Sequence, residues 1–134
     1  MIPLFFQPMV SYTFNKEEKL CSQKLIGEMF LSGKSFLCYP LKVVWLDSPD
    51  DSYPYPVQVA FSVPKRIFNK AHDRNLIKRR MRETYRLRKN ILYELLEIKN
   101  RKIGLMIVYI AKEKLEFHQI ESAMAKLISR LNKE

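Results

Sequence analysis

Basic side chains are concentrated in one stretch of this 134-residue sequence. Eleven Lys or Arg residues lie between Lys65 and Lys89, against Asp73 and Glu83, so this stretch carries +9 of the net charge of +10. Guanidinium groups match phosphate oxygens in bidentate geometry, and lysines attract the same oxygens as point charges. Such a concentration indicates a docking surface for a polyanion rather than an ordinary solvated face.

The spacing within this stretch predicts an amphipathic helix from about Asn69 to Ile98. With a rotation of about 100° per residue, polar cationic side chains fall on one arc and apolar ones on another side that can pack on a sheet. The cationic strip consists of Arg74, Asn75, Lys78, Arg79, Arg82, Arg86 and Lys89, and the apolar side consists of Ile77, Met81, Thr84, Ile91 and Leu95. Lys65, Arg66 and Lys70 extend the strip backwards, whereas Arg80 points away from it.

Catalytic and metal chemistry have weaker candidates. His72, His118 and Glu83 could supply an acid and a base for RNA cleavage, but no helical or strand spacing links the two histidines. Cys21 and Cys38 have no zinc or redox spacing, and their apolar surroundings indicate reduced core residues. We therefore expect no catalytic residue and no metal ligand in this chain.

Composition also bears on the compartment. No apolar stretch approaches the roughly 20 residues of a membrane span, and the N-terminal run lacks the features of a signal peptide. Reduced cysteines favour a cytoplasmic location. We expect no membrane partner.

The elements around the basic helix predict an α+β sandwich with helices packed on a small mixed sheet. Asn15 and Glu18 resemble an N-cap and its first-turn partner, and the apolar residues of this first helix recur at helical spacing until Gly33. Those residues are Leu20, Leu25, Ile26, Met29 and Phe30. Strands are expected over 35–46, with an edge or bulge at Pro40, over 57–63 and over 103–111.

A polar, turn-rich connection joins the first two strands, which predicts that they pair as a hairpin. A closing helix follows from the apolar stripe of Phe117, Ile120, Met124, Leu127 and Leu131. The expected order is α-β-β-α-β-α in a single domain over 13–134, with residues 1–12 as a loose N-terminal tail. On the second strand Gln58, Ala60 and Ser62 form a small polar face, which either leaves room for a flat ligand or is covered by a helix.

The run from Arg74 to Glu83 resembles the signature of the protein subunit of bacterial ribonuclease P. That signature reads Arg-Asn-Arg, a hydrophobic residue, Lys-Arg, two variable residues and Arg. Phe61-Ser62-Val63-Pro64-Lys65-Arg66 resembles the strand end before this helix, and Phe30-Leu31-Ser32-Gly33 the close of helix one. The resemblance extends from about Phe14 to Leu131. Leu76 departs from it, because the signature usually has Arg there.

The resemblance implies an α-β sandwich whose β-α-β crossover is left-handed. It implies a subunit of an endoribonuclease that removes the 5′ leader of precursor tRNA, in which a catalytic RNA subunit performs the hydrolysis. The implied partners are that RNA and precursor tRNA, with no obligate protein partner. Mg²⁺ is expected in the holoenzyme, held mainly by the RNA and the substrate and not by this chain.

The charge pattern and the resemblance together assign two sets of residues. For RNA binding they are Lys65, Arg66, Lys70, Arg74, Asn75, Lys78, Arg79, Arg82 and Arg86. For the precursor-tRNA leader cleft, between helix one and the sheet, they are Ile26, Phe30 and Ser62. Ile26 stands where the family commonly has an aromatic residue and cannot stack on a base. The alternative for Ile26 and Phe30 is a plain core role.

Two other functions stay open at this point. The first is a general RNA-binding or ribosome-associated basic protein with no role in tRNA maturation. The second is a reader of duplex DNA, which is disfavoured because neither a helix-turn-helix nor a dimer seam is visible in the sequence.

Overall fold

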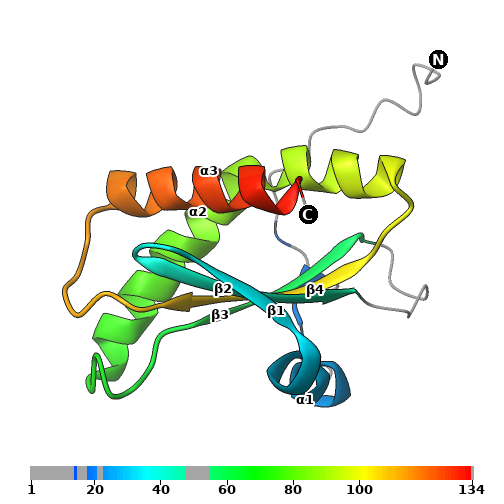
Figure 1. The fold of residues 1–134 in the computed structure, drawn as a ribbon. Helices are drawn as coiled ribbons and strands as arrows, with labels where there is room; N and C mark the ends of the chain where they lie inside the picture. The colour runs from blue at the N-terminus through cyan, green and yellow to red at the C-terminus, as the bar shows by residue number, and fades with distance from the viewer. Residues whose placement is uncertain (1–13, 15–17, 21–22, 48–54, 134) are drawn as a thin grey trace.

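A computed structural model describes residues 14, 18–20, 23–47 and 55–133 of the chain. Its elements are α1 (Gln23–Ser32), β1 (Lys34–Cys38), β2 (Leu41–Asp47), β3 (Val57–Ser62), α2 (Ala71–Ile98), β4 (Ile103–Tyr109) and α3 (Phe117–Leu131). The strands form one sheet, with α2 and α3 on one face and α1 on the other (Figure 1). This confirms the α+β class, with one strand more than expected. The tail predicted over 1–12 lies outside the described residues.

The strand order is β1-β2-β4-β3, so the predicted hairpin between the segments 35–46 and 57–63 is wrong. The first segment is itself a hairpin, β1 and β2, which turns at Tyr39-Pro40. The physical reason is that Pro40 offers no N–H to a ladder and therefore ends β1. β2 pairs antiparallel with β4, and β3 pairs parallel with β4 from the other side.

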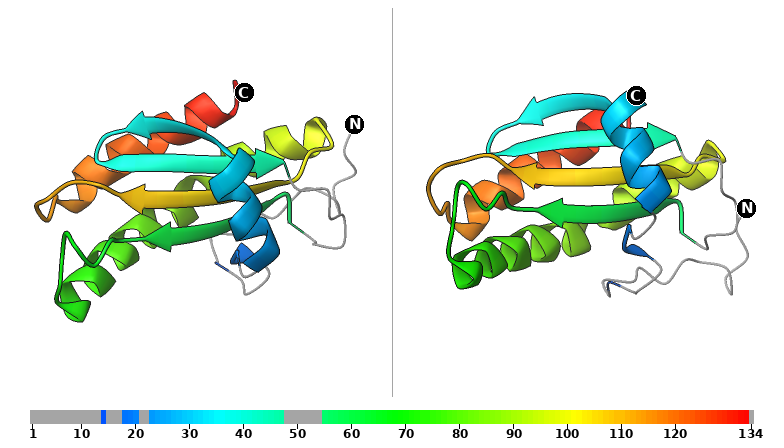
Figure 2. Two further views of the ribbon diagram at one scale, coloured as in Figure 1. Left: turned by 60° about the horizontal axis from the view of Figure 1, so that its bottom comes forward. Right: turned by 90° about the horizontal axis from the view of Figure 1, so that it is seen from below.

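The connection from β3 through α2 to β4 is a crossover between parallel neighbours. In the right-hand view of Figure 2 both strands run from right to left, β4 lies above β3, and α2 passes behind the sheet. This arrangement is left-handed, against the strong general preference for right-handed crossovers. The handedness that the resemblance implied is confirmed.

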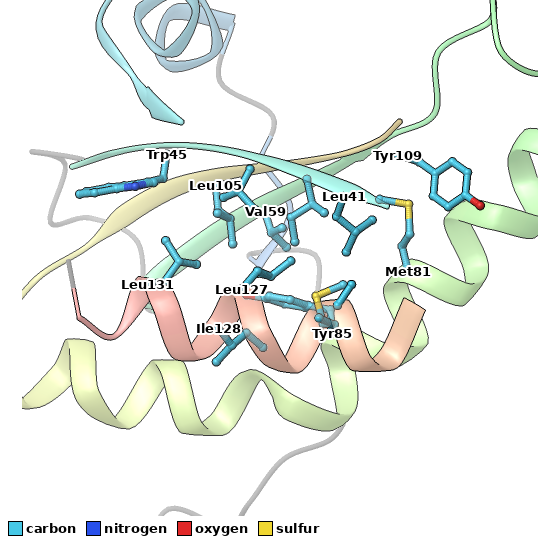
Figure 3. Close-up of a cluster of buried hydrophobic side chains, with 14 of the residues drawn as sticks. Leu41, Trp45, Val59, Met81, Tyr85, Leu105, Tyr109, Leu127, Ile128 and Leu131 are labelled. Carbon is cyan, nitrogen blue, oxygen red and sulfur yellow. The ribbon is translucent and has the colours of Figure 1, made fainter. Parts of the chain in front are cut away.

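The main core lies between the sheet and the two long helices. Leu41 and Leu105 of the sheet meet Met81 and Tyr85 of α2 and Leu127 of α3, and all of these side chains are fully buried (Figure 3). A minor cluster on the opposite face holds α1 against the sheet. There Gly104 allows close approach, because a Cβ at this position would lie 2.9 Å from Leu25 Cδ2.

Helix α1 begins at Gln23, later than predicted. Glu18 is therefore not a first-turn partner, and Asn15 lies outside the described residues. Instead Lys19 forms a parallel bridge with Val59, and the Leu20 N–H donates to the Val59 carbonyl at 2.9 Å. Residues 18–20 thus run along the outer edge of β3.

The buried side of α2 follows a ridge of residues four apart. Ile77, Met81, Tyr85, Lys89 and Tyr93 are all buried, with exposed fractions of 0 to 7%. Such ridges are inclined to the helix axis, and α2 crosses the sheet obliquely (Figure 1). The prediction that Lys89 lies on the cationic strip is therefore wrong.

The same inclination of the buried ridge explains why two residues predicted to be buried on α2 are not. Ile91 was expected to pack on the sheet but is 54% exposed, and Leu95 is only half-buried. The straight arc drawn from the sequence describes the first half of α2 and fails in the second, because the contact surface turns around the helix.

Lys89 is instead half of a buried ion pair. Its Nζ donates to Glu18 Oε1, and the Tyr93 hydroxyl donates to the same oxygen at 2.7 Å. The Tyr85 hydroxyl lies 3.4 Å from that of Tyr93, and Nζ lies 5.8 Å from the Phe14 ring centroid. Burial raises the pKa of both tyrosines well above the usual 10.0, so both hydroxyls stay protonated. The network fixes residues 14 and 18 to the middle of α2.

Candidate nucleic-acid interface

The connection from β3 to α2 presents three cations. Lys65 and Arg66 are exposed on a turn that is closed by a hydrogen bond from the Ile67 N–H to the Pro64 carbonyl at 3.1 Å. Lys70 is the N-cap residue of α2. The positive end of the helix dipole adds to the potential of these side chains, so this end of the molecule attracts anions.

The first turns of α2 form an open hollow of about 560 Å³, which completes the interface. Its lining consists of His72, Asn75, Leu76, Lys78, Arg79 and Arg82. Arg79 and Arg82 are exposed and Lys78 is half-buried. The structure therefore brings four predicted residues together around one depression. Leu76, where the signature has Arg, gives that depression an apolar wall.

These cations are not neutralised by neighbours. Within the part of the chain that the structure describes, none of Lys65, Arg66, Lys78, Arg79 and Arg82 is ion-paired with a carboxylate. Charges of one sign on adjacent side chains repel one another and raise the free energy of the folded chain unless an anion binds. An anion bound at this surface would therefore relieve the repulsion between these side chains.

The four other arginines of the stretch have partners within the protein, and for three of them the contact is 2.8 Å or shorter. Arg74 donates through Nη1 to the Phe68 carbonyl at 2.8 Å, which holds the connection before the helix. Arg80 donates to the Leu115 carbonyl at 2.7 Å, so it points away from the strip as predicted. Arg86 pairs with Glu83 at 2.8 Å, one turn earlier on the same helix. Their remaining donors can still face a ligand, but their positions are fixed by protein contacts.

Lys114 is a neighbour of the interface that sequence reasoning missed. It is ion-paired with Asp73 in the first turn of α2, and this hydrogen bond is the main cause that lowers the pKa of Asp73 below its usual 3.8. His72 lies 3.2 Å from the same carboxylate. No local pattern links residues 73 and 114, because only the fold brings the loop after β4 to the start of α2.

The candidates for the leader cleft differ in their surroundings. Phe30 is 73% exposed, so the core alternative is wrong for it. Ile26 is half-buried and packs in the minor cluster with Val44, Leu46, Ala60 and Met106. Ser62 lies at the end of β3 and is half-buried.

Beyond α1, one row of side chains crosses the same face of the sheet. The register aligns Leu37, Lys42, Val108 and Ser62 on the four strands. Leu37 and Lys42 are exposed, and the other two are half-buried. The right-hand view of Figure 2 shows that α1 crosses only the other end of the sheet. Of the two alternatives for the small polar face of β3, cover by a helix holds for Ala60, which packs under α1. Room for a ligand holds for the row of Ser62, which α1 leaves open.

The proposed acid and base residues do not form a cluster. His72 pairs with Asp73, His118 with Glu116, and Glu83 with Arg86. Among the described residues, no three His, Cys, Asp or Glu side chains are grouped so that they could hold a metal ion. No described helix is long and apolar enough to cross a membrane.

The fold and the interface define a class: a small, basic α+β protein with a cluster of cations around the start of its longest helix. A family model described as Ribonuclease P matches residues 14–132. The chain belongs to this family, whose members are subunits of a tRNA-processing endoribonuclease.

Individual relatives agree with this. The ribonuclease P protein component of Porphyromonas gingivalis is 31% identical over 121 residues, which is 90% of this chain and 88% of that protein. That of Chlorobium phaeobacteroides is 39% identical over 85 residues, or 62% and 58% of the two chains.

Solved structures show the same fold. The RNase P protein of Staphylococcus aureus has a TM-score of 0.66 at 16% identity, covering 85% of this chain and 94% of that one. The RNase P protein of Thermotoga maritima has a TM-score of 0.66 at 19% identity, covering 84% and 96%.

Proposed function

We propose that this chain binds the catalytic RNA subunit of ribonuclease P and the 5′ leader of precursor tRNA, and so supports endonucleolytic removal of the leader. The RNA subunit performs the hydrolysis, with Mg²⁺ held mainly by the RNA and the substrate. The observation that carries the proposal is the group of cations around the hollow at the start of α2, which have no carboxylate partners among the described residues.

The chemistry of this surface suits a phosphate backbone. Arg79 and Arg82 are exposed guanidinium groups one turn apart on the same helix face, close to the spacing at which a run of phosphates can be met. Asn75 adds a neutral donor and acceptor for a ribose or base edge. Each contact is modest and screened by salt, so affinity comes from the sum.

The open row on the sheet suits an extended single strand. Ser62 and Val108 give a flat, small surface, and Lys42 offers a cation to a phosphate. Phe30, exposed on α1 beside this face, offers a ring for base stacking. We therefore place the leader across the sheet beside α1, on the face opposite to the main core.

The test is reconstitution with the catalytic RNA. Replacing Arg79 and Arg82 by Ala together should weaken RNA binding and reduce the magnitude of its log-log salt slope by about 1.5, since each lost phosphate contact removes roughly 0.7–0.9. The matched control is Lys24→Ala with Lys126→Ala, which removes the same charge from exposed positions on α1 and α3. A salt slope that the arginine pair leaves unchanged would refute the assignment of this surface.

Activity separates this function from general RNA binding. At low Mg²⁺, the wild-type protein should increase cleavage of precursor tRNA by the catalytic RNA at the mature 5′ end, and the arginine pair should not. A protein that binds the RNA without any effect on cleavage would be a general RNA-binding protein. Cleavage by the purified protein without RNA would instead establish an autonomous nuclease.

A further inference from the structure

A second group of cations lies at the other end of the molecule, where α2 and α3 both end. The sequence hides this group, because residues 90–134 are almost neutral in total. Their charges are nevertheless separated along the chain. Lys99 to Lys102 contains three cations and Lys126 to Lys133 contains three, and neither run contains an acid.

The fold brings these runs together. The Lys99 Nζ donates to the Asn132 carbonyl at 3.0 Å, which joins the end of α2 to the end of α3. The Arg130 guanidinium lies 4.4 Å from the ring centroid of Phe36 in β1, so α3 delivers its cation to the edge strand. Lys133 follows within the same turn of chain.

The edge strand contributes a further cation. Lys34 lies opposite Trp45 in register, and its Nζ is 5.1 Å from the Trp45 ring centroid. Arg101 lies over the same ring at 5.6 Å and pairs with Asp47 at 2.8 Å. We name the surface formed by Lys34, Lys99, Arg101, Arg130 and Lys133 the C-terminal corner.

The corner has more positive charge than its helix ends require. Cations near helix C-termini are stabilised by the helix dipole, which accounts for Lys99 and Lys133. It also favours Arg130, which lies in the last turn of α3, but it does not account for Lys34, which comes from a strand. Among the described residues, none of these four cations is ion-paired with a carboxylate.

The aromatic rings make this charge suitable for recognition. A cation held over a ring is already ordered, so less side-chain entropy is lost when a ligand binds. A guanidinium over a ring also keeps its in-plane N–H donors for phosphate oxygens. Trp45 and Phe36 are both buried, so they fix their cations to the core rather than to a mobile loop.

We propose that the C-terminal corner binds a second segment of RNA backbone. Arg79 lies in α2 and Lys99 is the C-cap residue of the same helix, twenty residues further on, which places the two surfaces roughly 30 Å apart at 1.5 Å per residue. One protein molecule therefore bridges two RNA segments, with α2 as a rigid spacer between them. The proposal rests on the proposed function, because it extends RNA binding to a surface outside the family signature.

The first experiment neutralises the corner. Arg130→Gln with Lys133→Gln should weaken binding to RNA about 10-fold and reduce the magnitude of the salt slope by about 1.5. Two titrations identify the source of the RNA: protein with the catalytic RNA, and holoenzyme with precursor tRNA. The control is Lys24→Gln with Lys112→Gln, which removes the same charge from exposed positions outside the corner. The proposal is overturned if corner and control variants behave alike in both titrations.

The second experiment maps the contacts. A photo-crosslinking amino acid at Lys133 and another at His72, beside the first surface, should label two different RNA segments in the holoenzyme. Labelling of one common segment, or no labelling from position 133, overturns the bridging model. If the pair Arg79→Ala and Arg82→Ala also leaves RNA binding intact, the proposed function itself fails, so the two failures are distinguishable.

Discussion

Replacing Lys89 tests the reassignment of this residue from the RNA surface to the core. Lys89→Met removes a charge whose side chain is 2% exposed, and it removes the Lys89 ammonium from the Glu18 carboxylate, which is 0% exposed. Breaking a buried ion pair by removing one partner typically costs 3–5 kcal/mol. For a chain of this size that corresponds to a fall in Tm on the order of 10–20 °C.

The double variant Glu18→Gln with Lys89→Met separates the charge from the packing. Without a stranded carboxylate, and with an amide oxygen still able to accept from Tyr93, most of the loss should be recovered, to within about 1–2 kcal/mol of the wild type. Urea unfolding of the wild type, the two single variants Glu18→Gln and Lys89→Met, and the double variant gives the coupling free energy directly. Lys126→Met, which removes an exposed cation from α3, should stay within about 0.5 kcal/mol of the wild type.

The salt dependence of RNA binding tests whether Lys89 lies in the core or on the RNA surface. If Lys89 lies in the core, the folded Lys89→Met protein should bind the catalytic RNA with the salt slope of the wild type, measured at a temperature well below its lowered Tm. A variant of unchanged stability with a reduced salt slope would show that Lys89 faces the RNA. That result would refute the inclined ridge on α2.

Three further predictions concern single contacts. Phe30→Ala should raise the KM for precursor tRNA about 5-fold or more, because one stacked base is lost. The kcat and the binding of mature tRNA should change little. The control Leu31→Ala, at a neighbouring residue that is 88% exposed, should leave KM and kcat unchanged. Arg80→Met should lower the free energy of unfolding, measured in urea, by about 1–2 kcal/mol, because the hydrogen bond to the Leu115 carbonyl is lost. The salt slope of RNA binding should stay unchanged. A loss of RNA affinity at equal stability would contradict the inward role of Arg80. Lys114→Ala should raise the pKa of Asp73 towards 3.8 in an NMR titration. Because the folded pKa is lowered, the pair's contribution to stability is present above pH 3.8 and lost as pH falls through the folded value, and a pH profile unchanged in the variant would exclude this pairing.

Long periodic elements were predictable from the sequence, and strand pairing was not. The helix expected over 69–98 is Ala71–Ile98, and the closing helix is Phe117–Leu131. The pairing failed because neighbouring strands with similar patterns were assumed to pair. A signal was present in Ile103–Tyr109, whose continuous apolar run suits a central strand covered on both faces. Placed centrally, this strand separates β2 from β3.

The candidate site was predictable to the extent that charge alone determines it. The cations on the first half of α2 and on its preceding turn lie together as expected. The role of Lys89 could not be read from charge, although its spacing of four from Tyr85 and Tyr93 was a signal for the buried ridge. Lys114 and the C-terminal corner depend on contacts between distant segments, which no local pattern contains.

The cations of the basic stretch fall into two groups, those with partners within the protein and those without a carboxylate in an ion pair. Of its eleven cations, Arg74, Arg80 and Lys89 bond within the fold, and Arg86 and Arg88 lie beside Glu83 and Glu121. The remaining six, which include Arg79 and Arg82, form no ion pair with a carboxylate among the described residues, and all lie before position 83. The partnered cations hold the loop before α2, the loop after β4 and residue 18 against the helix, so the other six project from a backbone that these contacts fix in place. Preorganisation of this kind lowers the entropy lost when a ligand binds, so the partnered arginines would support RNA binding at the proposed surface through the backbone that they hold in place.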